Sequence, residues 1–301
     1  MVRQPSRGRS APTRARGQVE FFARSAAWLA LGLTLAACSG ATMLSNSASE
    51  LEETASAASP ANLASLSDVV ARNPNDAQAY NMRGSVYGQG GHAKEALADF
   101  NKAISLDPKY GQAYANRGLV HRQMNNLDLA LADYNKALAI DATYAAAYLG
   151  RGMVHRQKGQ LIAALNDFNK AIAIRPDNAQ AYYNRGLLYQ SQRQHQFAID
   201  DFATAVTLSP QQAEPFVARG LSYLAVNDVK SAAGDLDEAV QAEPQNAAAW
   251  VGRGLAYERL GENEKAAASY AKALNLNREY PAAKDGFARV GGQYGKRYQA
   301  F

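Results

Sequence analysis

The sequence repeats itself with a period of 34 residues and without insertions. Arg-Gly pairs mark the period at Arg83-Gly84, Arg117-Gly118, Arg151-Gly152, Arg185-Gly186, Arg219-Gly220 and Arg253-Gly254. An aromatic residue stands four positions before each glycine, and a tyrosine or histidine stands three positions after it. Two alanines also recur in every unit, in series that begin at Ala96 and Ala103. Because such a period is typical of stacked repeats, it predicts a fold in which each unit packs on its neighbours.

The rest of the unit identifies the kind of repeat. A large side chain follows at Phe100, Tyr134, Phe168, Phe202, Leu236 and Tyr270, and four units end near Pro108, Pro176, Pro210 and Pro244. This pattern resembles the tetratricopeptide repeat (TPR), a pair of helices with aromatic, small, Tyr, Ala, Phe, Ala and Pro positions at these offsets. The resemblance implies an all-α fold, a right-handed α-solenoid of six 34-residue TPR helix pairs. The units are 77–110, 111–144, 145–178, 179–212, 213–246 and 247–280.

Helices at both ends are expected to cover the stack. Pro74 and Leu66 lie one period before Pro108 and Phe100, which predicts an N-terminal half-repeat helix within 60–76. Residues 281–301 are expected to form a C-terminal capping helix and a tail.

Three packing features follow from the unit. Small residues are needed where the two helices meet, so we expect Gly84 to face Ala96. In five units the turn between the helices falls at a residue that tolerates positive φ, namely Gly91, Asn125, Gly159, Asn227 or Gly261. In the fourth unit Arg193 occupies this position instead. Five units carry an aspartate 16 residues after the recurring arginine, which predicts a ladder of Arg-Asp pairs.

The first residues are typical of an exported lipoprotein. Residues 1–37 end in a run of twelve mostly apolar residues, which rises about 18 Å as a helix. Because this is shorter than the roughly 30 Å hydrocarbon core of a membrane, the run predicts a signal peptide. The motif L-A-A-C, ending at Cys38, resembles the lipobox of bacterial lipoproteins. The resemblance implies that 1–37 is removed and that Cys38 carries a covalent lipid in the bilayer. Ser39 in place of Asp favours the outer membrane, facing the periplasm.

Composition narrows the classes of partner. The first 37 residues hold six arginines and one acid, so the rest of the chain carries 26 basic and 26 acidic side chains. Because these charges balance, this part of the chain has no net positive electrostatic field to attract nucleic acid, and we expect no nucleic-acid partner. The single cysteine excludes an internal disulfide framework. Residues 38–59, rich in Ser, Ala, Thr and Glu, are predicted to form a flexible tether.

TPR proteins bind partners on the concave surface formed by the first helix of each unit. The resemblance therefore implies that proteins or peptides bind in a groove made by residues at the fifth, twelfth and thirteenth positions: Asn81, Gln89, Arg122, Gln123, Arg156, Gln157, Tyr183, Gln190, Val217 and Leu224. We expect Arg122 and Arg156 to hold an acidic group of the partner, since a guanidinium can grip a carboxylate with two hydrogen bonds. Val217 and Leu224 are expected to hold its apolar part.

No catalytic or metal-binding motif is recognisable. Of the four histidines, His121 and His155 replace the tyrosine of other units, and neither HExxH, a nucleophile elbow nor a Gly-rich phosphate loop is present. The sequence predicts no enzyme and neither a cofactor nor a metal apart from the lipid on Cys38.

The lipobox, tether and six repeats together resemble bacterial outer-membrane TPR lipoproteins of the NlpI type. Such proteins are adaptors for peptidoglycan hydrolases and periplasmic proteases in the cell envelope. Two alternatives stay open at this point. One is a pilotin-type assembly factor for a secretin, and the other is a peptidoglycan- or glycan-binding module in which Tyr183 stacks on sugars. The sequence leaves the oligomeric state undecided.

Overall fold

The computed structural model describes residues 59–293, 295–296 and 298. The predicted signal peptide, Cys38 and all but the last residue of the predicted tether lie outside the described residues. Within the described part the structure contains fourteen α-helices and no strand. In the same part, no helix is both long enough and apolar enough to cross a membrane.

Twelve of the helices form six pairs. The first helix of each pair, here named the A helix, occurs as α3 (Ala77–Gln89), α5 (Gly111–Gln123), α7 (Ala145–Gln157), α9 (Ala179–Ser191), α11 (Ala213–Ala225) and α13 (Ala247–Arg259). The second, the B helix, occurs as α4 (Ala93–Leu106), α6 (Leu127–Ile140), α8 (Leu161–Ile174), α10 (His195–Leu208), α12 (Val229–Ala242) and α14 (Asn263–Leu276). The predicted α-solenoid of helix pairs is confirmed.

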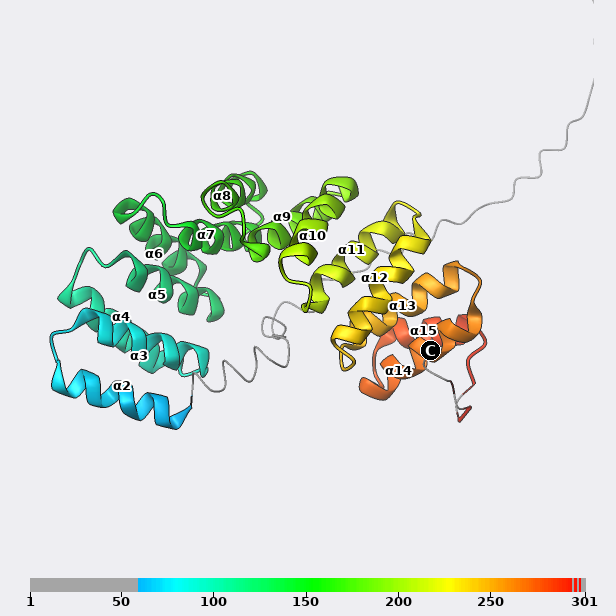
Figure 1. The fold of residues 1–301 in the computed structure, drawn as a ribbon, viewed down its shortest axis with the longest axis horizontal. Coiled ribbons are helices and arrows are strands. Elements are labelled where there is room, and N and C mark those ends of the chain that lie inside the picture. The colour runs from blue at the N-terminus through cyan, green and yellow to red at the C-terminus, as the bar shows by residue number, and fades with distance from the viewer. Residues whose placement is uncertain (1–58, 294, 297, 299–301) are drawn as a thin grey trace, which may run out of the picture. The chain divides into compact units, whose positions relative to one another are not determined.

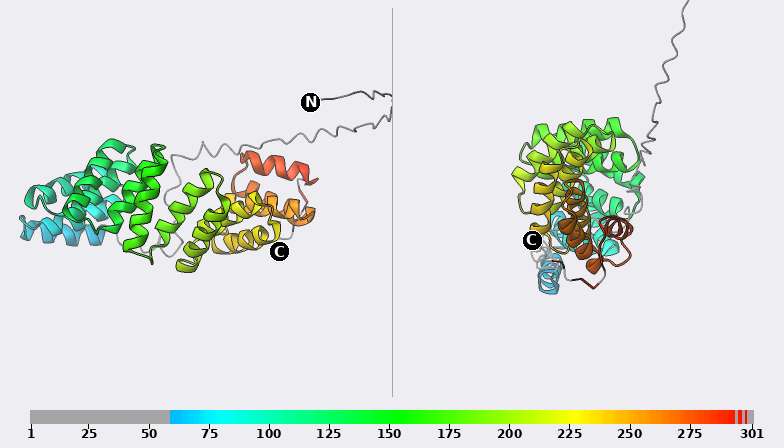
Figure 2. Two further views of the ribbon diagram at one scale, coloured as in Figure 1. Left: turned by 90° about the horizontal axis from the view of Figure 1, so that it is seen from above. Right: turned by 90° about the vertical axis from the view of Figure 1, so that its right-hand side faces the viewer.

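A single helix flanks the pairs at each end of the described part. The preceding helix is α2 (Pro60–Arg72), which is capped by the Ser59 hydroxyl, and the final helix is α15 (Pro281–Arg289). Each A helix packs on its own B helix and on the A helix of the next unit, and each B helix also packs on the next A helix. The pairs therefore follow one another along the stack in sequence order, as the colour gradient in Figures 1 and 2 shows.

The recurring small and aromatic residues form the core. The two alanine series that begin at Ala96 and Ala103 are fully buried, as are the rings of Phe100, Phe168 and Phe202. A Cβ on Gly84 would lie 2.9 Å from Cε1 of Phe100, so the glycine makes room for the ring of the B helix. The close approach is therefore between a backbone and a ring. In the second unit a Cβ on the equivalent Gly118 would also lie 3.3 Å from the carbonyl of Ala130, the counterpart of Ala96.

The turns between A and B helices have the predicted backbone. Positive φ occurs at Gly91, Asn125, Gly159, Asn227 and Gly261. Arg193 adopts it as well, with φ of 59°, so the fourth unit keeps the same turn despite a side chain that disfavours it.

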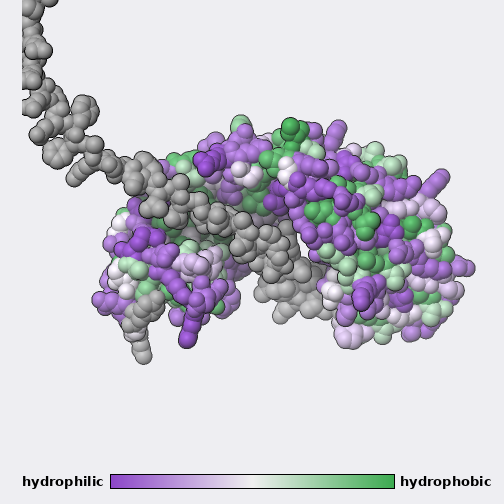
Figure 3. Space-filling view, turned by 180° about the vertical axis from the view of Figure 1, so that it is seen from behind, coloured by the Kyte–Doolittle hydropathy of each residue, from purple (hydrophilic) through white to green (hydrophobic). Residues whose placement is uncertain are grey.

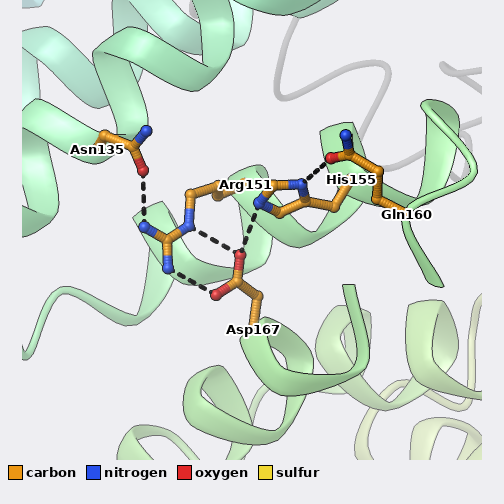
Figure 4. A network of polar contacts seen from close by, with 5 residues as sticks. All are labelled: Asn135, Arg151, His155, Gln160 and Asp167. Carbon is orange, nitrogen blue, oxygen red and sulfur yellow. Dashed lines mark hydrogen bonds and ion pairs between the residues drawn. The ribbon is translucent and has the colours of Figure 1, made fainter. Parts of the chain in front are cut away.

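The predicted Arg-Asp ladder is confirmed in the first five units. Each arginine donates two hydrogen bonds of 2.6–2.9 Å to the aspartate of its own B helix: Arg83 to Asp99, Arg117 to Asp133, Arg151 to Asp167, Arg185 to Asp201 and Arg219 to Asp235. These hydrogen bonds raise the pKa of the arginines. In the third unit, Arg151 also donates to Asn135 of the preceding B helix at 2.8 Å, so it joins two units (Figure 4).

The sixth unit pairs its arginine differently. Ser269 occupies the aspartate position, and Arg253 instead binds Asp237 of the preceding unit at 2.6 Å. Arg253 also donates to the Ser269 hydroxyl at 2.8 Å. Beyond it, Glu258 accepts hydrogen bonds from the Tyr270 hydroxyl at 2.6 Å and from Arg289 at 2.7 Å, which ties α15 to the last pair.

The ladder predicts a large loss of stability when one partner is removed. Asp167 is 5% exposed, so Asp167→Asn leaves Arg151 with an uncompensated charge and is expected to cost about 3 kcal/mol of unfolding free energy in urea titrations. Asp177→Asn is the matched control, because Asp177 pairs with Arg175 in solvent and its loss is expected to change the urea midpoint little. Equal losses in the two variants would contradict a structural ladder.

The C-terminal network predicts a pH-dependent cap. Although burial raises the pKa of Glu258, hydrogen bonds from Arg289 and Tyr270 lower it overall below its ordinary value of 4.5. A depressed folded-state pKa means that the stabilisation is complete above pH 4.5 and is lost as the pH falls through the lower folded value. Arg289→Gln is therefore expected to reduce the urea midpoint at pH 7 and to have a smaller effect at pH 3. An effect of equal size at both pH values would exclude this network as the cause.

Candidate partner-binding surface

The A helices supply the candidate surface because they contact one another along the stack. Residues at their fifth, twelfth and thirteenth positions are those predicted to face a partner. On the face drawn in Figure 3, hydrophilic and hydrophobic side chains are interspersed.

The structure places the predicted groove residues in three groups. The exposed ones are Gln89, Gln123 and Gln157, the partly exposed ones are Arg122, Arg156, Tyr183, Gln190 and Val217, and the buried ones are Asn81 and Leu224. Eight of the ten are thus accessible to some degree.

Two predicted residues are corrected by their burial. Asn81, 6% exposed, donates to the Tyr110 hydroxyl at 3.1 Å and accepts from Asn116 at 3.0 Å. Leu224, 4% exposed, packs in a core cluster with Leu236. Both side chains are buried where they join neighbouring helices, so they are not accessible to a partner in this structure. Of the two residues predicted to hold the apolar part of a partner, only Val217 remains accessible, and it packs partly against the same cluster.

Gln190 at the twelfth position connects two A helices. Its Nε2 donates to the Ala218 carbonyl at 3.0 Å and to the Ser222 hydroxyl at 2.9 Å. The amide therefore has its donors satisfied by α11. By contrast, Gln157 donates only to the exposed Asn125 side chain at 2.9 Å, a contact that a partner can replace.

Arg122, Arg156 and Tyr183 are brought together by the structure. The pKa of Arg156 is lowered, chiefly by burial and further by the positive charge of Arg122, while Tyr183 acts in the opposite direction. Burial, with a smaller contribution from Glu214 of the next A helix, raises the pKa of Tyr183 to about 12. This part of the candidate surface thus places two cations beside a neutral phenol.

Two residues beside this pair were missed by the sequence analysis. Asn184, 1% exposed, accepts from Nη2 of Arg156 at 3.4 Å. Burial raises the pKa of Tyr134 to about 12, and the guanidinium of Arg122, which lies at its hydroxyl, opposes that rise. A Cβ on Gly150 would overlap the Tyr134 ring. The sequence carried one signal for this contact: Tyr134 replaces the phenylalanine of other units, and Gly150 follows it in the next A helix.

Two of the four histidines, His121 and His155, lie beside the ladder. His155 Nε2 lies 3.8 Å from Asp167 and its Nδ1 contacts Gln160 at 2.6 Å (Figure 4). Burial lowers the pKa of His121, which lies 4.0 Å from Asp133. Among the residues that the structure describes, no group of three or more His, Cys, Asp or Glu side chains is placed to hold a metal ion.

Comparison with solved structures gives the same architecture. A chain of the APC/C hetero-tetramer Cut9-Hcn1 is 21% identical, with 75% of this chain and 44% of that chain covered and a TM-score of 0.67. This chain therefore spans less than half the length of that relative. Pseudomonas aeruginosa pilF is 20% identical, with 71% and 97% covered and a TM-score of 0.65. At these identities the likeness shows the fold alone.

A third structure adds a described binding site. YrrB, a TPR protein with an unusual peptide-binding site, is 26% identical, with 62% of this chain and 96% of that chain covered and a TM-score of 0.52. No curated protein sequence matches this chain.

Family models match most of the repeat region. Those described as TPR repeat match residues 118–159 and 152–192, and those described as tetratricopeptide repeat match residues 77–110, 179–212 and 217–284. Together these matches cover more than half of the chain. With its confirmed helix pairs, the chain belongs to the tetratricopeptide repeat proteins, whose solenoid is a scaffold suited to protein–protein interaction.

Proposed function

We propose that this chain is a lipid-anchored scaffold of the bacterial cell envelope that binds proteins along its A helices. Cys38 carries the lipid, and the repeat domain extends into the periplasm from the outer membrane. The partners are peptidoglycan hydrolases and periplasmic proteases, which the scaffold brings together for envelope maintenance.

One observation carries the binding role. The arginines that recur before each glycine are engaged in the fold, but Arg122 and Arg156 lie in the groove without such a partner, beside the exposed amides of Gln123 and Gln157. Amides and guanidinium groups hydrogen-bond peptide carbonyls and carboxylates. The peptide-binding site described for the similar YrrB supports a peptide segment as the occupant.

The glycan-binding alternative is disfavoured by the position of Tyr183. Its ring, which is only partly exposed, packs against Phe202 with centroids 5.8 Å apart. Stacking on a sugar requires a free aromatic face, which this ring offers poorly. The pilotin-type alternative differs in the identity of the protein partner and predicts that a secretin is mislocalised when the gene is deleted.

A sedimentation experiment tests the scaffold role. The purified full chain is mixed with purified sacculi, with and without envelope proteins extracted from the same cells. A scaffold is expected to pellet with the sacculi only when the extract supplies proteins. Sedimentation with sacculi alone would favour the glycan-binding module, and failure to pellet in both mixtures would contradict both roles at the sacculus.

A labelling experiment tests the anchor separately. Cells that express the wild-type chain or Cys38→Ser are grown with radioactive palmitate and then fractionated. The wild-type chain is expected to carry the label and to fractionate with the outer membrane, whereas Cys38→Ser is unlabelled and released from the membrane. A variant that stays membrane-bound would refute anchoring through this cysteine.

A further inference from the structure

The turns between A and B helices lie along one edge of the stack, here named the turn edge. In units two to four this edge comprises residues 124–129, 158–163 and 192–197. Gln157, next to the turn of the third unit, donates to Asn125 in the turn of the second at 2.9 Å. Lys158 pairs with Asp128 between the same two turns. Successive turns are therefore neighbours along the edge.

The three most exposed large apolar side chains of the described residues all lie on the turn edge. They are Leu129, Ile162 and Phe197, which are 54%, 79% and 60% exposed and are here named the apolar row. Each stands at the second or third position of its B helix, in α6, α8 and α10. The other units carry charged or small residues at these two positions, so the row is confined to units two to four: Lys94, Glu95, Lys230, Ser231, Glu264 and Lys265.

The core beside the apolar row is filled by other side chains. Leu127 and Leu131 pack on the core of the second unit, and Leu161 and Leu165 pack on the core of the third. Phe197 contacts the Tyr189 ring, with centroids 5.4 Å apart, and still leaves most of its surface in solvent. The row is therefore directed toward something outside the fold.

The charges and the spacing of the turn edge favour a lipid surface. In units two to four the edge carries the cations Lys158 and Arg193 and the single acid Asp128, which pairs with Lys158. The exposed Arg193 can therefore meet anionic headgroups while its apolar stem lies beside the row. Side chains that protrude separately, one repeat apart, enter a fluid phase one by one, whereas a folded partner would need a pocket for each.

The predicted tether joins the repeats at the same edge. Leu66 of α2 lies one period before Phe100 of the B helix α4, and α2 packs on α3 as each B helix packs on the next A helix. The start of α2, capped by Ser59, is therefore the start of a B-type helix and lies at the turn edge. Ser59 is 21 residues after Cys38. A flexible chain of that length spans about 25 Å on average, so the edge can reach the bilayer that holds the lipid.

We propose that the turn edge of units two to four rests on the bilayer in which Cys38 is anchored. Leu129, Ile162 and Phe197 enter the boundary between headgroups and acyl chains, and Arg193 binds lipid phosphates. The proposal rests on the proposed lipid anchor and adds the orientation of the repeats on the membrane. Anchoring makes the contact intramolecular and so strengthens it. Without the anchor the row resembles at most one acyl chain, which binds reversibly, so Cys38→Ser is still expected to leave the membrane.

A tryptophan placed in the row reports insertion. The lipidated chain with Phe197→Trp is reconstituted into vesicles of phosphatidylethanolamine and phosphatidylglycerol, with or without bromine on the acyl chains. An interfacial side chain lies about 5–10 Å into the boundary, so brominated lipid is expected to quench this variant at least about twofold more than Lys170→Trp. Lys170 is exposed on α8, eight residues after Ile162. The wild-type chain gives the background of Trp250, which is 7% exposed.

A matched pair of variants tests the row as a unit. Leu129→Ser/Ile162→Ser, added to Phe197→Trp, is expected to remove most of the quenching. Val69→Ser/Met82→Ser, added to the same background, removes two apolar side chains that are 39% and 48% exposed away from the turn edge. This control is expected to leave the quenching unchanged. Urea midpoints are expected to be similar in both variants, because all four side chains are exposed.

Flotation of the vesicles separates this proposal from the anchor. A chain that floats but shows no quenching at position 197, or equal quenching at positions 197 and 170, keeps its anchor and overturns the edge contact. If Leu129→Ser/Ile162→Ser also halves the mass measured by light scattering in detergent, the occupant of the row is a second copy of the chain. A chain that does not float has no lipid anchor, which refutes the proposed anchoring and the edge contact with it.

Discussion

The bidentate contact between the arginine of each A helix and the aspartate of its B helix sets the geometry of the stack. A guanidinium group donates two hydrogen bonds to a carboxylate only within narrow limits of distance and angle, so each contact fixes the position of its A helix relative to its B helix. The same guanidinium lies 5.5–5.8 Å from the aromatic ring three residues earlier in the A helix. In units two to four it also reaches an asparagine of the preceding unit. The unbroken 34-residue repeat keeps each of these five arginines 16 residues from its aspartate.

The last unit shows that the charge balance matters more than the position of the carboxylate. Where Ser269 replaces the usual aspartate, the preceding unit carries Asp237 at the position that holds an asparagine in units one to three. Arg253, 3% exposed, is thus neutralised across the unit boundary. A buried guanidinium without a carboxylate would be costly, so the two departures compensate each other. Against this rule, the unbalanced Arg122 and Arg156 stand out as groups whose partner is expected from another molecule.

Much of the fold could be predicted from the sequence because one pattern recurs six times. The helix pairs, the positive φ at Asn125 and the pairing of Arg151 with Asp167 all follow from fixed offsets. The candidate site was harder to predict, because a residue's position in the repeat indicates the face of the helix on which it lies but not how far its side chain is buried. Asn81 and Leu224 were expected to face a partner, yet Asn81 is buried in hydrogen bonds with Tyr110 and Asn116, and Leu224 is buried in a core cluster with Leu236. The role of Tyr134 depends on Gly150, 16 residues away in the next unit, a combination that recurs only once, at Tyr270 and Gly286. The anchor at Cys38 stays a prediction, since it lies outside the described residues.

Site-specific photocrosslinking tests the central claim, that the ladder holds the stack together and leaves the A-helix groove for protein partners. A photoreactive residue is placed in living cells at Gln123 or Gln157 in the groove, or at the exposed Lys170 on the B helix α8 as the control. Partner adducts are expected from both groove positions and not from Lys170, and Asp167→Asn, by loosening the stack, should reduce them. Adducts from Lys170 alone, or equally from all three positions, would contradict the account.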